Sequence, residues 1–161
     1  MMKYENATIE DIKQLLPLCR RFQLESWQNF ADFDYDLMDD WLAERIADHQ
    51  SYVGIARNNG FVEQKDSVSR DIAGCLIGMA FTFPYSRTLV AGDYLWYVHP
   101  KFRGGMTGVR LLKNFELWAK EKGAVRLIGG ATSGIASKRT ADLMQHIGFK
   151  AFGALAEKEL R

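Results

Sequence analysis

A glycine-rich turn between an apolar run and an amphipathic run is the feature that most constrains this chain. Residues 97–113 read YVHPKFRGGMTGVRLLK: an aromatic, apolar run stops at Pro100, Arg103 and three glycines follow, and helical spacing begins. Such a turn joins a strand to a helix, and its glycines let the backbone come close to a ligand. Free N–H groups at a helix N-terminus bind anions, so phosphate is the expected ligand. The alternative is a tight strand-to-helix turn without a ligand.

Two common phosphate-binding loops do not fit this turn. A Walker A loop has a lysine and a hydroxyl residue directly after its last glycine, where this chain has Val109 and Arg110. The dinucleotide fingerprint G-x-G-x-x-G fails on spacing, because the glycines here run G-G-x-x-G. In addition, Lys122 and Gly123 stand about where that fold places an acidic residue. The turn therefore belongs to neither class of loop.

The spacing of apolar residues predicts the elements around the turn. Strands are expected over residues 2–7, 51–57, 71–83, 89–98 and 124–130, with one or two more in the closing stretch 148–160, and helices over 9–24, 36–49, 108–122 and from 137 onward. Residues 25–36 are predicted to be a loop and 61–70 a polar connection. Since 89–130 forms a β-α-β unit, at least one strand pair is parallel. The chain is therefore predicted to be α+β, or mixed α/β.

Composition excludes several classes of protein. A length of 161 residues predicts a single domain over 1–161. The formal net charge of +1 gives no reason to expect nucleic acid or a membrane surface as partner. No apolar run reaches the roughly 20 residues of a membrane span, and the N-terminus lacks the apolar core of a signal peptide. Cys19 and Cys75 lie in apolar surroundings, which favours free thiols in a reducing compartment. We therefore expect a cytoplasmic protein.

The glycine turn resembles motif A of the GNAT family of N-acetyltransferases. That motif follows a strand ending in V-x-P and reads Arg or Gln, two residues, Gly, one residue, then Gly or Ala. Arg103 matches its first position and Gly108 its last. Met106 stands where the middle glycine is expected, and Gly105 precedes it. The departure concerns how closely the backbone approaches a ligand at position 106.

The closing stretch resembles motif B of the same family. Ser137 occupies the place of an Asn, Leu143 and Met144 that of a Leu-Tyr pair, and Gly148 with Phe149 that of the final Gly-Phe. The resemblance covers nearly the whole chain. It implies a GNAT-like fold, in which a central mixed, mostly antiparallel sheet is flanked by about four helices.

The resemblance also implies acetyl-CoA as cosubstrate and a primary amine of a small molecule or protein as acceptor. The pantetheine arm would pair with strand 89–98 near Tyr97 and Val98, and a main-chain N–H of that strand would polarise the thioester carbonyl. The expected cosubstrate-binding residues are Tyr97, Val98, Arg103, Gly104, Gly105, Met106, Thr107, Gly108 and Ser137. No metal is expected, because the three histidines are scattered.

Three residues are candidates for the acid–base chemistry. Asp93 lies in an apolar strand, where burial would raise its pKa, and His99 has a suitable intrinsic pKa. Tyr94 is a third candidate. The respective alternatives are a solvated edge residue, a solvent-facing loop histidine and a core tyrosine. Met144 stands where the family's usual acid, a tyrosine, would protonate the CoA thiolate; Tyr97 or Tyr94 would be the substitute, or the thiolate would leave as an anion.

An aromatic, acidic segment is the candidate acceptor site. Trp27, Phe30, Phe33 and Tyr35 lie beside three aspartates, at positions 32, 34 and 36, and such a mixture suits a cationic amine. The alternative is that these aromatics belong to the core or to a homodimer surface.

A second alternative concerns the function of the chain. The chain would bind acyl-CoA with little or no catalytic activity, as the methionines at positions 106 and 144 favour.

Overall fold

The structure, a computed structural model, describes residues 1–59 and 71–160, and these contain five strands and four α-helices. In chain order the elements are β1 (Met2–Asn6), η1 (Ile9–Asp11), α1 (Ile12–Glu25), η2 (Trp27–Phe30), α2 (Tyr35–Ala47), β2 (Ser51–Asn58), β3 (Ile72–Thr82), β4 (Leu89–Val98), η3 (Pro100–Phe102), α3 (Thr107–Glu121), β5 (Leu127–Ile128) and α4 (Ser137–His146), where η marks a 3-10 turn. The predicted polar connection 61–70 lies outside the described residues.

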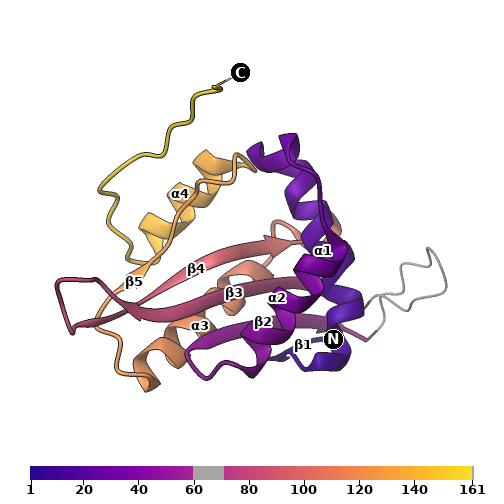
Figure 1. Cartoon of the computed structure of the whole chain (residues 1–161), viewed down its shortest axis with the longest axis horizontal. Coiled ribbons are helices and arrows are strands. Elements are labelled where there is room, and N and C mark those ends of the chain that lie inside the picture. Colours follow the sequence, from indigo (N-terminus) through magenta and orange to yellow (C-terminus); the bar gives the residue numbers. More distant parts are fainter. Residues whose placement is uncertain (60–70, 161) are drawn as a thin grey trace.

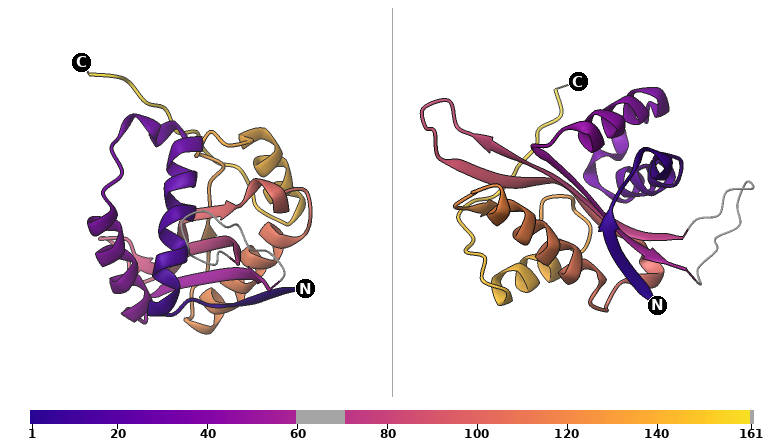
Figure 2. Two further views of the ribbon diagram at one scale, coloured as in Figure 1. Left: turned by 90° about the vertical axis from the view of Figure 1, so that its right-hand side faces the viewer. Right: turned by 90° about the horizontal axis from the view of Figure 1, so that it is seen from below.

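The strands form one sheet in the order β1-β2-β3-β4-β5. The first three pairs are antiparallel, and β4 pairs with β5 in parallel. Helices α1 and α2 cover one face of the sheet, and α3 and α4 cover the other (Figure 2). The predicted α+β fold, with a mixed, mostly antiparallel sheet and four helices, is confirmed.

Each face of the sheet has its own apolar core. On the α1 side, Leu15 and Leu42 pack against Ile55 and Ile77 of the central strands. On the α3 side, Leu111, Leu112 and Phe115 pack against Tyr52, Ala56 and Leu76. Because β2 and β3 are covered on both faces, they are apolar along nearly their whole length rather than alternating. The two cysteines are buried free thiols, as predicted.

A β-bulge interrupts the pairing of β3 with β4. Ile77 lies opposite Leu95, and Gly78 lies opposite Asp93, so Tyr94 has no partner in the register. A bulge of this kind re-aims the side chains around it. Asp93 and Tyr94, whose side chains the bulge redirects, come directly after Gly92, the last residue of β4 that pairs with β5.

Three local predictions were wrong. Within the described part of the chain, residues 147–160 contain no strand; Ile147 and Phe149 still pack against the core on the α3 side, and the chain then runs away from the sheet (Figure 1), with Phe152 86% exposed. The expected strand 124–130 is reduced to the two residues of β5. This short strand offers the closing stretch little edge to pair with. The closing stretch is also rich in Ala and Gly, which have low strand propensity. The predicted loop 25–36 holds η2 and the start of α2.

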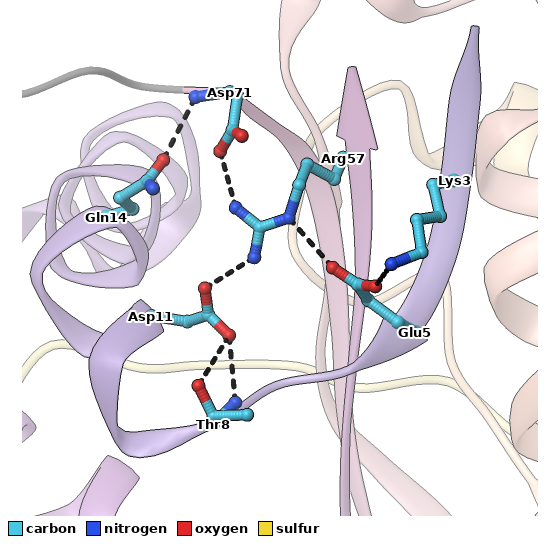
Figure 3. Close-up of polar contacts among 7 residues, drawn as sticks. All are labelled: Lys3, Glu5, Thr8, Asp11, Gln14, Arg57 and Asp71. Atoms are coloured by element: carbon cyan, nitrogen blue, oxygen red, sulfur yellow. Dashed lines mark hydrogen bonds and ion pairs between the residues drawn. The ribbon is translucent and has the colours of Figure 1, made fainter. Parts of the chain in front are cut away.

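Arg57 of β2 ties the N-terminal elements together (Figure 3). Its guanidinium donates to Glu5 of β1 at 2.8 Å, to Asp11 before α1 at 2.5 Å, and to Asp71 before β3 at 2.6 Å. Burial alone would raise the pKa of Asp11, but the Thr8 N–H and the Arg57 guanidinium outweigh it and lower that pKa. One half-buried cation therefore joins two strands of the sheet to the start of α1.

Replacing Arg57 with Met should lower the free energy of unfolding by about 2–3 kcal/mol, because three carboxylates lose their cation. Urea denaturation at pH 7 measures this. Since the folded-state pKa of Asp11 lies below its ordinary value of 3.8, the stability from this pair is present above that pH and is lost as the pH falls through the folded value. The difference between variant and wild type should therefore shrink in acid.

Replacing Lys3 with Met serves as the control. Lys3 pairs with Glu5 from a largely exposed position, so its loss should change stability by less than about 1 kcal/mol. Equal effects of the two substitutions would contradict a central role for Arg57.

Candidate active site

The glycine turn presents an open helix N-terminus. Gly104 has φ +89, a left-handed conformation that favours glycine. Among the described residues other than its two chain neighbours, none has a heavy atom within 4 Å of where a Cβ on Gly105 would stand. The first main-chain bond of α3 runs from the Arg110 N–H to the Met106 carbonyl at 2.9 Å, so the N–H groups before Arg110 point out of the helix end. Thr107 and Gly108 begin that helix. The turn can therefore hold an anion.

Met106 fits the turn without the glycine of the family pattern. Its backbone is right-handed, at φ −86 and ψ −1, which any residue adopts. Its side chain is 55% exposed and leaves the helix end uncovered. The departure from the pattern at this position therefore does not close the turn.

Strands β4 and β5 part after only two residue pairs, Ala91 with Leu127 and Gly92 with Ile128. The chain beyond β5 then runs to the end of α1 (Figure 1), where the Trp27 N–H donates to the Ser133 carbonyl at 3.0 Å. Within the described residues, the outer edge of β4 after Asp93 has no neighbouring strand. An extended chain can pair with such an edge.

Asp93 lies where the two strands part. The Gly130 N–H donates to its half-buried carboxylate, and burial raises its pKa to about 6, although that hydrogen bond acts in the opposite direction. A Cβ on Gly129 would stand 3.2 Å from Asp93 Oδ1 and 2.7 Å from Met144 Cε. The glycine therefore leaves room for an ionisable carboxylate and a methionine side chain to converge on one point.

Met144 occupies this point from the α4 side. Its side chain is buried, and its methyl group lies against Gly129. An apolar contact thus stands where the resemblance expects an acid.

The other acid–base candidates have different surroundings. Tyr94 is 56% exposed; its ring meets Trp41 edge-on at 5.7 Å and its hydroxyl donates to the Met79 sulfur. His99 is buried, its Nδ1 accepts the Lys101 N–H at 3.3 Å, and its Nε2 contacts the Arg21 guanidinium. The two nitrogens of His99 are therefore both engaged, whereas the Asp93 carboxylate faces the parting of the strands.

Arg103 is held by the protein itself. Its Nε donates to the Val98 carbonyl at 2.9 Å, its Nη2 donates to Glu25 Oε2 at 2.6 Å, and its guanidinium lies over the Tyr97 ring at 5.1 Å. The Tyr97 hydroxyl donates to the other oxygen of Glu25 at 2.5 Å. Burial alone would raise the pKa of Glu25, but these two partners outweigh it and lower that pKa. Glu25 was missed from the sequence, because nothing local links the end of α1 to the turn.

The predicted acceptor aromatics form two groups. Trp27 and Phe30 stack at 6.2 Å beside Ser133, whereas Phe33 and Tyr35 meet edge-on at 4.9 Å at the start of α2. A cavity of about 1590 Å³ runs along β5 and α4, and its lining includes Trp27, Gly129, Gly130, Ser137 and Met144. The structure therefore joins Trp27, Ser137 and the parting of the strands in one hollow.

Two further observations concern the described part of the chain alone. No three His, Cys, Asp or Glu side chains gather there as metal ligands. None of its helices is long and apolar enough to cross a membrane.

The fold is that of a mixed α+β protein, and comparison with known proteins assigns the family. A model of the acetyltransferase (GNAT) family matches residues 14–149, and the chain belongs to this family. No curated protein sequence matches it.

Solved structures show the same fold at low sequence identity. A predicted acetyltransferase with acetyl-CoA from Clostridium acetobutylicum superposes with a TM-score of 0.74 at 18% identity, covering 99% of this chain and 97% of the other. An aminoglycoside 6′-N-acetyltransferase from Acinetobacter baumannii gives 0.71 at 13%, covering 100% and 99%. Glucosamine-6-phosphate N-acetyltransferase from Arabidopsis thaliana gives 0.73 at 12%, covering 100% and 99%.

Replacing Asp93 with Asn should stabilise the protein at pH 8 by about 1–2 kcal/mol. The folded-state pKa of about 6 lies above the ordinary 3.8, so the native state holds its proton more tightly and loses stability as the pH rises through 6. Asn carries no charge and still accepts the Gly130 N–H. Urea denaturation at pH 8 and pH 4.5 should show a gain that shrinks in acid. A variant less stable than wild type at pH 8 would contradict the burial of a charged carboxylate.

Proposed function

We propose that the chain is an N-acetyltransferase that moves the acetyl group of acetyl-CoA to a primary amine of a small molecule or protein. One observation carries the proposal: an ionisable carboxylate, Asp93, lies where β4 and β5 part, and the same strand ends at the open glycine turn. From Asp93 to Val98 the strand spans about 17 Å. This arrangement suits a cosubstrate whose phosphate group binds at the glycine turn and whose reacting acyl group lies near Asp93.

The N–H groups from Gly104 to Gly108 would hold the pyrophosphate of the cosubstrate. The pantetheine arm would pair with the outer edge of β4. The His99 N–H bonds back to Ala73 of β3 at 2.8 Å, so the N–H of Val98, one residue earlier, points to the opposite, open side. The acetyl-CoA in the similar Clostridium acetobutylicum protein supports this cosubstrate.

Asp93 would act as the general base. Its ionised carboxylate takes a proton from the acceptor ammonium, and the neutral amine attacks the thioester carbonyl. A C–N bond forms, a main-chain N–H of β4 stabilises the oxyanion, and the C–S bond then breaks, while the nitrogen loses its second proton to water. Because a thiol has a pKa near 8.5, the CoA thiolate can leave without an acid at position 144.

The acceptor would approach from the aromatic segment after α1. Trp27 lies in the hollow that reaches Gly129, while Phe30, Phe33 and Tyr35 extend the aromatic surface toward α2. Aromatic faces and nearby carboxylates favour a cationic amine. The amine substrates named for the aminoglycoside and glucosamine-6-phosphate enzymes of the same fold are of this kind.

One observation favours a second candidate function, binding of acyl-CoA with little or no catalysis. Met144 puts an apolar group where the family commonly has an acid. Binding and turnover must therefore be measured separately.

Calorimetry with acetyl-CoA tests the cosubstrate site. Wild type should bind with a micromolar Kd, and Gly104→Asp should weaken binding at least about tenfold, because a carboxylate would stand beside the anion. Gly123→Asp is the matched control, since Gly123 also has a positive φ but lies at the opposite end of α3, and it should bind like wild type. Equal binding by all three proteins would rule out the turn as the phosphate site.

Steady-state acetylation of a panel of amines tests the chemistry. Replacing Asp93 with Asn should lower kcat by about 10²–10⁴, with little change in the Kd for acetyl-CoA. The wild-type rate should fall as the pH drops below about 6, because Asp93 must be ionised to accept a proton. Tight acetyl-CoA binding without turnover of any amine would instead support the second candidate.

A further inference from the structure

The motif arginine is held by the protein itself in this structure. Two of the three nitrogens of the Arg103 guanidinium are engaged, Nε by the Val98 carbonyl and Nη2 by Glu25, and its charge is matched by that carboxylate. A phosphate bound through Nε or Nη2 of Arg103 would compete with these partners. An arginine without a counter-ion is therefore better suited to assist the N–H groups of the turn.

Arg139, in the first turn of α4, lies beside the glycine turn. Its Nη2 is 3.5 Å from where a Cβ on Gly104 would stand, and in the described part of the chain, the glycine's own neighbours aside, no other heavy atom lies within 4 Å of that point. Arg139 is exposed, and within the described residues its guanidinium forms no ion pair. Because Gly104 has no side chain, the space beside it is open to the Arg139 guanidinium, which has no counter-ion among the described residues.

We propose that Arg139 is the cationic residue that binds the phosphate groups of acetyl-CoA at the glycine turn, while Arg103 is a positioning residue that fixes the turn to β4 and α1. This inference rests on the proposed function. A guanidinium donates two parallel hydrogen bonds to a phosphate and cannot lose its proton, which makes an unpaired arginine well suited to this contact.

The two arginines should respond differently to the same substitution. Arg139→Gln removes an exposed, unpaired charge, so it should leave the melting temperature unchanged and raise the Kd for acetyl-CoA about tenfold or more. Arg103→Gln removes the partner of Glu25, so it should lower the melting temperature. Calorimetry and thermal denaturation of the full chain measure both effects.

Lys138→Gln is the matched control. Lys138 lies in the same turn of α4 and carries the same charge, but it pairs with Asp142 at 2.7 Å. Its substitution removes one positive charge from the helix and should change the Kd for acetyl-CoA by less than about twofold, since exposed charges away from the ligand are largely screened.

A second ligand identifies which phosphate Arg139 contacts. If Arg139 binds the pyrophosphate, Arg139→Gln should raise the Kd for 3′-dephospho-CoA by the same factor as the Kd for CoA. If it binds the 3′-phosphate, wild type and variant should bind 3′-dephospho-CoA equally; either result supports the proposal. Arg139→Gln binding acetyl-CoA as tightly as Lys138→Gln would overturn it while leaving the proposed function intact. Failure of wild type to bind acetyl-CoA would overturn both.

Discussion

The site depends on the early end of the pairing between β4 and β5. A parallel pair that continued past Gly92 and Ile128 would cover the outer edge of β4 and leave no room for a ligand. Three features prevent it: the bulge at Tyr94 turns β4, Gly129 leaves space for the side chains of Asp93 and Met144, and the chain after β5 is tied to the end of α1. The same geometry buries Asp93 enough to raise its pKa to about 6.

Helix α1 is fixed to the sheet at both of its ends by arginine–carboxylate pairs. Asp11 before its first turn meets Arg57 of β2, and Glu25 in its last turn meets Arg103 at the glycine turn. Apolar packing of Leu15 against the central strands holds the middle of the helix. Packing is not directional, whereas the paired charges specify where each end lies. The second pair also places the glycine turn, so the position of α1 and the geometry of the proposed cosubstrate site are coupled.

Much of the fold could be predicted from periodicity and turn residues. Long elements with a clear apolar stripe, such as α3, and the glycine-bounded turn were found because their signals are local. The predicted strands at the C-terminus were wrong, because apolar residues in a short stretch do not provide a pairing edge, and β5 offers only two residues. Of the residues in the candidate site, the glycine turn and Asp93 were proposed from the sequence, whereas Glu25 and Arg139 were not.

The sequence by itself determined the order of the elements as far as α4, the mixed sheet, the glycine turn at the start of α3 and the family resemblance, since the signals for these lie in residues close together in the chain. Only the tertiary structure decided which arginine is neutralised and which is unpaired. Glu25 is 78 residues from Arg103, and the approach of Arg139 to Gly104 depends on how α4 packs. The net effect of a charge depends on its partners in space, and no local pattern specifies these partners.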